Sequence, residues 1–421
     1  MSEENPTPLA SLVRAGDRQT EAEPIPAGSG APFIFMAHDV SNAYLVTTSD
    51  GDVLVNTGFN ASAERNKALF APHRSGALRY IILTQSHADH YGGVPEMRET
   101  GTRIVGGPEF NEALADMMGL QAFFGPRTQK LWGTTMAQGG PMKPQPTPAD
   151  VAPDILVDNR LTLEVGDRTF ELIHAPEGET VDNILVWLPN EKVVFTGNTF
   201  GPVWLSMPFL NTLRGDKPRL VRTYLKSLAK VRDLGAEVLI TGHGAPIVGK
   251  DRIRNDLDRI EAAVTYVRDY TLEGMKAGKD VHTLMREFAF PGNVAIGDFH
   301  GKASWAVRSI WQEYSGWFHY EDGTTALYGV PRSAVHGDIA ELAGGAGALA
   351  ARARKYVEDN RPLEALHLLD IALGADPDNV EALTVKRAAS HSLLEAGGGQ
   401  NLSETMWLRS EIAEIDAKLA Q

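Results

Sequence analysis

The chain contains no cysteine and no long apolar run. The absence of cysteine excludes disulfides, thiolate metal ligands and cysteine nucleophiles, so any bound metal must use histidine, carboxylate or amide ligands. No apolar run approaches the roughly 20 residues that a membrane-spanning helix needs. The first residues are acidic where a secretory signal is basic, which predicts a cytoplasmic protein.

Basic residues are also few. Lys and Arg number 40 against 54 Asp and Glu, which gives a net charge of −14. This balance argues against a nucleic-acid partner and against binding to an anionic membrane. Hydrophobic residues make up 43% of the 421 residues, which is typical of a folded protein long enough for more than one domain.

The order of apolar and polar stretches predicts three parts. Residues 1–31 are rich in Pro, Gly, Ser and Glu and are expected to form an N-terminal tail or arm. Residues 32–252 alternate strand-like runs with helices, beginning with a hairpin over 42–58. Residues 253–421 have helical periodicity throughout, which predicts an all-α second domain. Residues 107–150 have neither period and are expected to form a long loop that covers the substrate.

A cluster of metal-ligating residues follows the apolar strand that ends at Leu83. The segment Thr84 to Gly93 contains His87, Asp89 and His90, and a turn at a strand end can direct such side chains at one or two metal ions. It resembles the metal-binding signature of the metallo-β-lactamase superfamily, which has histidine where Gln85 stands. The resemblance implies an α/β fold, the αββα sandwich. An amide oxygen is a weaker ligand than imidazole, so Gln85 is expected to weaken the first metal site.

The same resemblance implies further ligands. His243, between two glycines after a predicted strand, corresponds to the last histidine of the superfamily and joins Asp89 and His90 on the second metal. Asn198 stands where the superfamily has a metal-bridging carboxylate. Because an amide carries no charge to hold two dications together, one metal is expected to bind more weakly than the other.

The middle ligand remains open between several residues of one turn. In the alkylsulfatase branch a glutamate supplies it, and alignment on that branch places Glu179 there. The alternatives within the turn are Glu177, Asp182 and His174.

A second resemblance concerns substrate binding. The run from Asn211 to Gly215 is similar to a region of the alkylsulfatases in which an arginine binds the sulfate group, although Asn211 lies directly before Thr212 and not further upstream. The resemblance implies that Asn211, Thr212 and Arg214 bind the substrate. A guanidinium offers paired N–H donors and a permanent charge to a tetrahedral oxyanion.

Residues 255–421 resemble the alkylsulfatase dimerisation domain, which implies a homodimer formed through the helical domain. The two resemblances predict a metal-dependent hydrolase of a small anionic ester, an alkyl or aryl sulfate, with Asp89 and Arg214 as catalytic residues. Its expected cofactor is Zn²⁺, one or two ions per chain, with Mn²⁺ or Fe as alternatives. Two other functions stay open: a lactone, carboxylic-ester or β-lactam hydrolase, and a non-catalytic dimeric binding protein with a degraded metal site.

Overall fold

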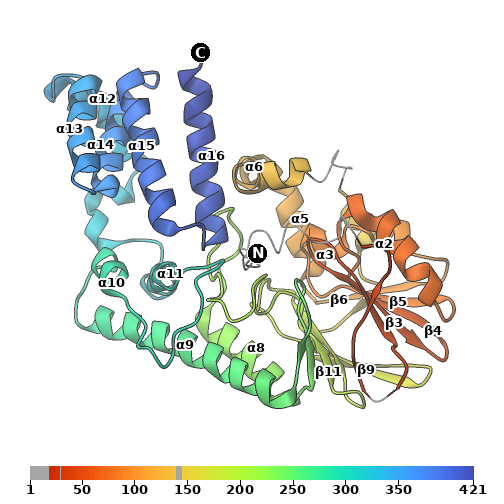
Figure 1. The fold of residues 1–421 in the computed structure, drawn as a ribbon. Coiled ribbons are helices and arrows are strands. Elements are labelled where there is room, and N and C mark those ends of the chain that lie inside the picture. The colour runs from red at the N-terminus through yellow and green to blue at the C-terminus, as the bar shows by residue number, and fades with distance from the viewer. Residues whose placement is uncertain (1–18, 29, 139–144) are drawn as a thin grey trace, which may run out of the picture. The chain divides into compact units, whose positions relative to one another are not determined.

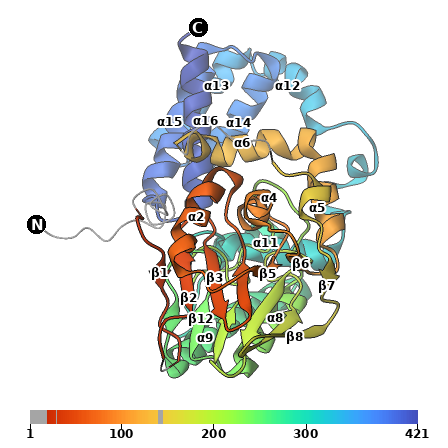
Figure 2. The same ribbon diagram turned by 90° about the vertical axis from the view of Figure 1, so that its right-hand side faces the viewer.

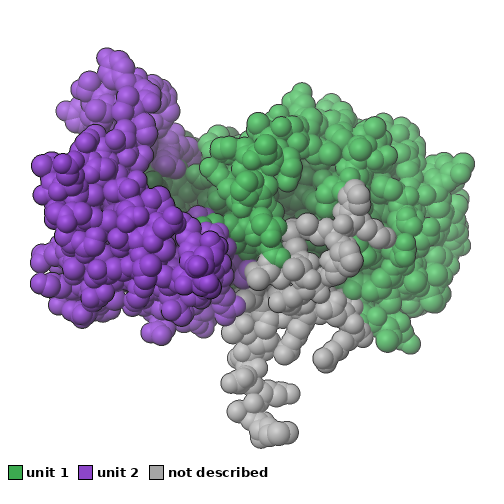
Figure 3. All heavy atoms as spheres, turned by 90° about the horizontal axis from the view of Figure 1, so that it is seen from above, with its two compact units in different colours: residues 1–311 green, residues 312–421 purple. Residues whose placement is uncertain are grey.

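A computed structural model describes residues 19–28, 30–138 and 145–421. The chain forms two compact units, residues 1–311 and residues 312–421, which Figure 3 distinguishes by colour. This division falls later in the sequence than the predicted domain boundary after residue 252, because three helices beyond that residue pack within the first unit. The boundary at residue 252 stays a prediction.

Two mixed β-sheets form the centre of the first unit (Figures 1 and 2). The first sheet has seven strands in sequence order: β1 (Glu23–Pro24), β2 (Ile34–Ala37), β3 (Ala43–Thr48), β4 (Gly51–Val55), β5 (Leu78–Ile82), β6 (Arg103–Gly106) and β7 (Ile155–Leu156). The second sheet has the order β13-β12-β11-β10-β9-β8. Its strands are β8 (Arg160–Val165), β9 (Arg168–His174), β10 (Ile184–Leu188), β11 (Val193–Phe195), β12 (Val238–Ile240) and β13 (Ile247–Val248).

The predicted hairpin is confirmed, since β3 and β4 pair in antiparallel register up to Thr48 and Gly51. Only part of the predicted N-terminal arm lies within the described residues. Residues 1–18 lie outside the described residues, but β1 pairs with β2 and Ile25 is buried in the core between the sheets. Residues 19–28 therefore belong to the first sheet and are not a free tail.

Helices cover the outer face of each sheet, which confirms the predicted αββα sandwich. One apolar core fills the space between the sheets, and a second lies between the first sheet and its helices. The helices on that side are α2 (Ala63–Phe70), α3 (Ala88–Tyr91), α4 (Val94–Met97), α5 (Phe110–Gly119), α6 (Gln121–Gln138) and α7 (Pro148–Val151). The second sheet carries α8 (Val221–Leu234) and α9 (Lys250–Lys276), followed by α10 (Val281–Glu287) and α11 (Ala303–Ser315).

The long loop predicted over residues 107–150 is wrong for most of its length. The chain there forms α5, α6 and the start of α7, and residues 139–144 lie outside the described residues. Over residues 121–133, helix α6 buries one large apolar side chain, Leu131, whereas Phe123 is 54% exposed. It also contains Pro126. A helix without a buried face leaves little periodic signal in the sequence, which explains the error.

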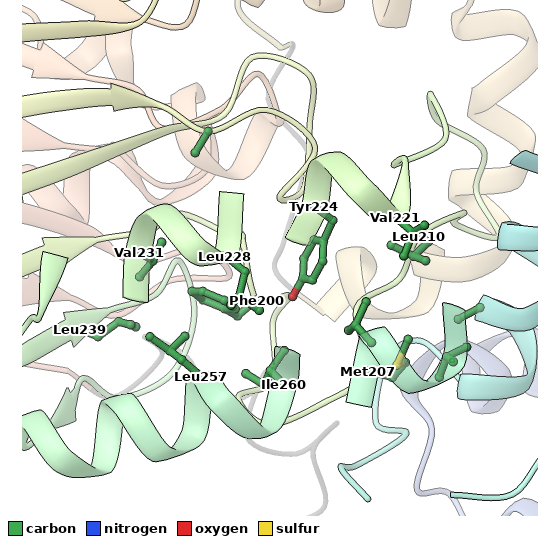
Figure 4. Packing of buried hydrophobic residues seen from close by; sticks show 14 of the residues in the cluster. Phe200, Met207, Leu210, Val221, Tyr224, Leu228, Val231, Leu239, Leu257 and Ile260 are labelled. Atoms are coloured by element: carbon green, nitrogen blue, oxygen red, sulfur yellow. The ribbon is translucent and has the colours of Figure 1, made fainter. Parts of the chain in front are cut away.

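The packing of α8 against α9 fixes the loop that joins β11 to α8. Tyr224 and Leu228 of α8 meet Leu257 and Ile260 of α9, and Phe200 of the loop lies among them (Figure 4). Helix α8 ends at Gly235, whose φ of 65° lies in the left-handed region that glycine adopts without strain. The loop over residues 196–220 is therefore anchored at both ends.

The second unit is all-helical, as predicted. It contains α12 (His336–Leu342), α13 (Ala346–Glu358), α14 (Pro362–Ala375), α15 (Val380–Gly397) and α16 (Leu402–Leu419). Alanines fill much of its core, and their small side chains let the helices approach closely. Within the described residues no helix is long and apolar enough to cross a membrane. The cytoplasmic location stays a prediction.

Candidate metal centre and anion-binding loop

Four loops at neighbouring strand ends meet at one edge of the sandwich. The backbone N–H of Ile184 donates to the carbonyl of Thr84 over 2.9 Å, which joins the end of β5 to the start of β10. Gly242 donates to Gly197 over 2.8 Å and accepts from Asn42, also over 2.8 Å. The motif after β5, the loop after β11 and the loop after β12 are therefore held against one another.

Three of the predicted metal ligands come together at this edge. The donor atoms of Asp89, His90 and His243 all lie within 4.8 Å of one another. Asp89 Oδ2 lies 3.8 Å from His90 Nε2 and 3.8 Å from His243 Nε2. His90 and His243 are buried, and Asp89 is mostly so. A carboxylate and two imidazoles at such separations can share one divalent cation.

Hydrogen bonds fix which nitrogen of His90 carries the proton. His90 Nδ1 lies 3.2 Å from Ser41 Oγ and 3.3 Å from Thr84 Oγ1. Ser41 already donates its hydroxyl hydrogen to the carbonyl of Gly242, and Thr84 donates its own to Asn56. Each hydroxyl has a single hydrogen, so both must accept from Nδ1–H. Nε2 therefore presents its lone pair beside Asp89.

His243 is oriented in the same way. Its Nδ1 faces the carbonyl of Val40, which can only accept, so Nδ1 carries the proton and Nε2 is free to bind a metal. Among the described residues, His90 Nε2 and Asn198 Oδ1 are buried atoms without a hydrogen-bond partner. A Cβ on Gly242 would collide with Asn198 Oδ1 and lie 2.9 Å from His90 Cε1, so these two side chains converge. The donor set fits a divalent cation.

The charges of these groups also suit a metal. Burial lowers the pKa of His90 to about 3 and lowers that of His243 as well. Burial alone would raise the pKa of Asp89, but the neighbouring histidines His90, His243 and His87 lower it. At neutral pH the cluster therefore consists of two neutral imidazoles and one carboxylate, the forms that ligate metals.

Gln85 and His87 are engaged elsewhere. Gln85 Oε1 accepts from the backbone N–H of Asn198 over 3.0 Å, and its Nε2 lies 2.9 Å from His87 Nδ1. An amide NH₂ can only donate, so His87 Nδ1 faces a donor. The Nε2 of His87 faces both an acceptor, Asp216 Oδ2 at 3.2 Å, and a donor, Arg214 Nη2 at 3.0 Å. Both ring nitrogens of His87 are thus occupied.

Glu179 lies beside His87 but is paired with a buried arginine. Glu179 Oε1 is 3.9 Å from His87 Nδ1 and 3.2 Å from Arg219 Nη2. Arg219, only 4% exposed, also donates through Nε to the carbonyl of Glu179 and through Nη1 to the carbonyl of Phe209. Its Nη2 lies 3.7 Å from Asp216 Oδ2. The guanidinium is therefore fixed on several sides.

The three other candidates for the middle ligand bind neighbouring groups. Glu177 accepts from the backbone N–H of Leu220 over 2.8 Å, and Asp182 accepts from the hydroxyl of Ser86 over 2.9 Å. His174 Nε2 lies 3.2 Å from the carbonyl of Val181. Their positions favour Glu179 as the residue of this turn that faces His87.

The loop after β11 brings positive charge to the same place. Arg214 Nη2 donates to Asp216 Oδ2 over 3.2 Å and lies 3.0 Å from His87 Nε2. Although burial opposes it, the hydrogen bond from His87 and the charges of Arg214 and Arg219 hold the pKa of Asp216 well below its ordinary value. Asp216 thus stays ionised and links His87 to both arginines.

Two donors in this loop remain available. Within the part of the chain that the structure describes, Thr212 Oγ1 and Arg219 Nη2 are buried without a hydrogen-bond partner, because the contact of Arg219 with Glu179 is an ion pair without hydrogen-bond geometry. Asn211 is half-buried next to Thr212. An available hydroxyl and two guanidinium groups on one loop are suited to an anion.

Sequence reasoning missed three residues here: Asp216, Arg219 and His300. His300 packs edge-on against Phe209 with ring centroids 4.9 Å apart, and enclosure of its ring lowers its pKa to about 3, helped by the charges of Arg219 and Arg214. None of the three lies in a recognisable motif. The only available signal was the concentration of charge after Arg214.

Comparison with known families agrees with this fold. Residues 37–243 match the metallo-beta-lactamase superfamily model, and residues 288–407 match the alkyl sulfatase dimerisation model. The chain therefore carries a metallo-β-lactamase domain followed by an alkylsulfatase dimerisation domain. The superfamily and the cluster of Asp89, His90 and His243 together imply a divalent metal.

Several of the individual relatives are alkylsulfatases. A linear primary-alkylsulfatase from Pseudomonas sp. (strain ATCC 19151) is 24% identical over 405 residues, 89% of this chain and 74% of the relative. An (R)-specific secondary-alkylsulfatase from Pseudomonas sp. is 25% identical over 401 residues, 88% of this chain and 58% of the relative. The chain is homologous to these enzymes, which confirms the resemblance seen in the sequence.

A solved structure shows the same fold. The stereoselective inverting sec-alkylsulfatase Pisa1 from Pseudomonas sp. superposes with a TM-score of 0.78 at 23% identity, over 92% of this chain and 66% of that protein. The chain spans less than two thirds of this protein and of the secondary-alkylsulfatase.

Proposed function

We propose that this chain is a metal-dependent hydrolase of alkyl or aryl sulfate esters. One observation carries the proposal: the metal-ligand cluster adjoins a loop with two arginines and an available hydroxyl, in a chain homologous to alkylsulfatases over most of its length. A sulfate monoester needs both features, since its sulfuryl group is anionic and water must be activated to attack it.

Asp89, His90 and His243 hold the metal, together with the Oδ1 of Asn198. Zn²⁺ is the proposed ion because two imidazoles and a carboxylate are typical zinc ligands. The oxygen donors of Asp89 and Asn198 leave Mn²⁺ and Fe as alternatives. When bound, the ion supplies Lewis acidity, which makes water acidic enough to lose a proton near neutral pH.

The protein groups position the reactants. Asp89, whose lowered pKa keeps it a carboxylate, accepts a hydrogen bond from the attacking water and so directs its lone pair. Arg214 pairs its guanidinium with the oxygens of the sulfuryl group, and Thr212 donates its hydroxyl to the same group. Asn211 is proposed to contact the substrate from the same loop. Asp216 holds Arg214 in place.

The proposal is tested by sulfate release from dodecyl sulfate and from 4-nitrophenyl sulfate, with a lactone, a carboxylic ester and a β-lactam as competing substrates. We expect sulfate release that depends on added Zn²⁺ or Mn²⁺ and is abolished by His243→Ala. The matched control is His282→Ala on the exposed face of α10, which should keep full activity. Turnover of the lactone, ester or β-lactam without sulfate release would support the second hydrolase class. Failure to bind metal or turn over any substrate would indicate a binding protein.

We also propose that the chain forms a homodimer through its second unit. That unit exposes large apolar side chains: Trp317 is 80% exposed, Tyr320 85% and Leu342 90%. Exposed apolar surface of this kind marks interaction sites, and the unit matches a dimerisation family. Light scattering should give twice the chain mass of 45.7 kDa. The monomer mass at micromolar concentration would contradict the proposal.

A further inference from the structure

We infer that each chain binds one metal ion, because the residues expected for a first metal site instead form a closed ion network around Arg219. The inference deepens the proposed function and rests on its metal centre. It concerns six side chains from three segments of the chain: Gln85, His87, Glu179, Arg214, Asp216 and Arg219.

The first step concerns the two ring nitrogens of His87. A metal at the first site would need the Nδ1 or Nε2 lone pair of His87. Nδ1 lies 2.9 Å from the amide Nε2 of Gln85, and Nε2 lies 3.2 Å from Asp216 Oδ2 and 3.0 Å from Arg214 Nη2. Gln85 cannot turn its oxygen toward His87 without breaking its 3.0 Å bond to the backbone N–H of Asn198. Both His87 nitrogens are thus withheld from a metal.

The second step is charge. The network contains two guanidinium groups, Arg214 and Arg219, and two carboxylates, Glu179 and Asp216, linked by ion pairs of 3.2 to 3.7 Å. The formal charges of these four groups cancel. A dication added here would leave uncompensated positive charge next to the almost fully buried Arg219, which is unfavourable in a poorly solvated site.

The third step is the contrast with the second site. The cluster of Asp89, His90 and His243 contains one carboxylate, and its donor atoms lie within 4.8 Å of one another. Among the described side chains, the buried Nε2 of His90 and Oδ1 of Asn198 still lack partners. A cation satisfies both the charge and these atoms. The two halves of the site therefore differ, and a fixed guanidinium supplies the positive charge that a first metal would have supplied.

The direct test counts metal ions on the purified, full-length protein. Chelator-stripped protein is titrated with Zn²⁺ by calorimetry, and the reconstituted protein is weighed by native mass spectrometry. We expect one Zn²⁺ per chain. Two ions per chain with affinities within tenfold of each other would overturn the inference.

Two single variants locate the ion. His243→Ala should lower the Zn²⁺ affinity at least a hundredfold, whereas His87→Ala should change it less than threefold and leave the count at one. A loss in His87→Ala as large as that in His243→Ala would overturn the inference. Circular dichroism checks that each variant is folded, and the count on the wild-type protein decides the question even if a variant is not.

A third comparison tests the role of Arg219. Gln85→His alone should still bind one Zn²⁺, because Arg219 remains beside Glu179. The double change Gln85→His with Arg219→Gln should bind two. A second ion in the single variant would show that the arginine is not the obstacle.

These readouts use no substrate, so they separate this inference from the proposed function. One ion without sulfate release would leave the inference standing and refute the function. Two ions with sulfate release would do the reverse.

Discussion

The hydroxyl groups behind His90 should control metal affinity without controlling the fold. Ser41 and Thr84 both accept from His90 Nδ1–H, at 3.2 and 3.3 Å, and so hold its Nε2 toward Asp89. Removing both, by Ser41→Ala with Thr84→Val, frees the ring to rotate and to change tautomer. Gly242 and Asn56, to which these hydroxyls donate, keep other donors, but in the double variant the buried Nδ1–H of His90 loses both acceptors.

The magnitude follows from the geometry. The carbonyl of Gly242 retains the N–H of Asn42 at 2.8 Å, and Asn56 Oδ1 retains the backbone N–H of Thr84 at 2.9 Å. Each single variant should therefore cost about 1 kcal/mol of unfolding free energy, and the double variant should cost about 1–3 kcal/mol more because Nδ1–H is left without an acceptor. Loss of a hydrogen-bond partner behind a metal ligand typically costs about 10- to 100-fold in affinity. One acceptor remains in each single variant, so we expect about tenfold there and about a hundredfold in the double variant.

The assay is competition for Zn²⁺ against a chromophoric chelator, with urea unfolding measured on the same samples. Ser392→Ala is the matched control, since Ser392 donates its hydroxyl to Ala388 in α15, over 3.1 Å, in the second unit. Its affinity should equal that of the wild-type protein. If the folded double variant bound Zn²⁺ within threefold of the wild type, the assignment of the His90 proton to Nδ1 would be wrong.

Three further predictions follow from the site. Arg214→Ala should lower kcat/KM for a sulfate ester about a hundredfold and leave kcat/KM for a neutral ester unchanged. Arg214→Lys should recover only part of the lost kcat/KM, because lysine lacks the paired N–H donors. Equal losses on both esters would contradict an anion-binding role for Arg214. Gly242→Ala should abolish metal binding measured by calorimetry, since the added Cβ collides with Asn198 Oδ1. The control Gly292→Ala should bind the metal normally, because a Cβ at Gly292 meets no atom within 4 Å. Asp216, whose pKa is lowered in the folded protein, contributes stability above its unfolded pKa of about 3.9 that is lost as the pH falls below it. Urea unfolding should therefore give Asp216→Asn a lower free energy of unfolding than the wild type at pH 7, and this difference should narrow below about pH 4. A difference in unfolding free energy that stays constant with pH would contradict the ion network.

Much of the fold could be predicted because its signals are local. The strands of both sheets are short apolar runs bounded by turns, and the turn at Ser49 and Asp50 allows only one pairing of β3 with β4. His87, Asp89 and His90 lie within four residues, so their chemistry is visible in one line of sequence. Helix α6 was missed because it buries no continuous face.

The network around Arg219 could not be predicted, because its members are joined only by the fold. His87 and Asp216 are 129 residues apart, and Gln85 and Asn198 are 113 apart. Asp216 and Arg219 are ordinary polar residues in their own segment, whereas Gln85, His87 and Glu179 were expected only as metal ligands. Sequence reasoning identified Gln85 as unusual but could not show that its amide is bonded at both ends, since this depends on where the backbone of Asn198 lies.

The contact between Val40 and His243 has a consequence for how the protein folds. These residues are 203 positions apart, and closing so long a loop is one of the slower and entropically more costly events in folding. Val40 lies between β2 and β3, and His243 follows β12. The metal centre is therefore complete only when the strands between these two residues have assembled into the sandwich. Metal uptake during refolding should therefore be a late event that reports closure of the entire first unit, and the ion should slow unfolding far more than it speeds folding.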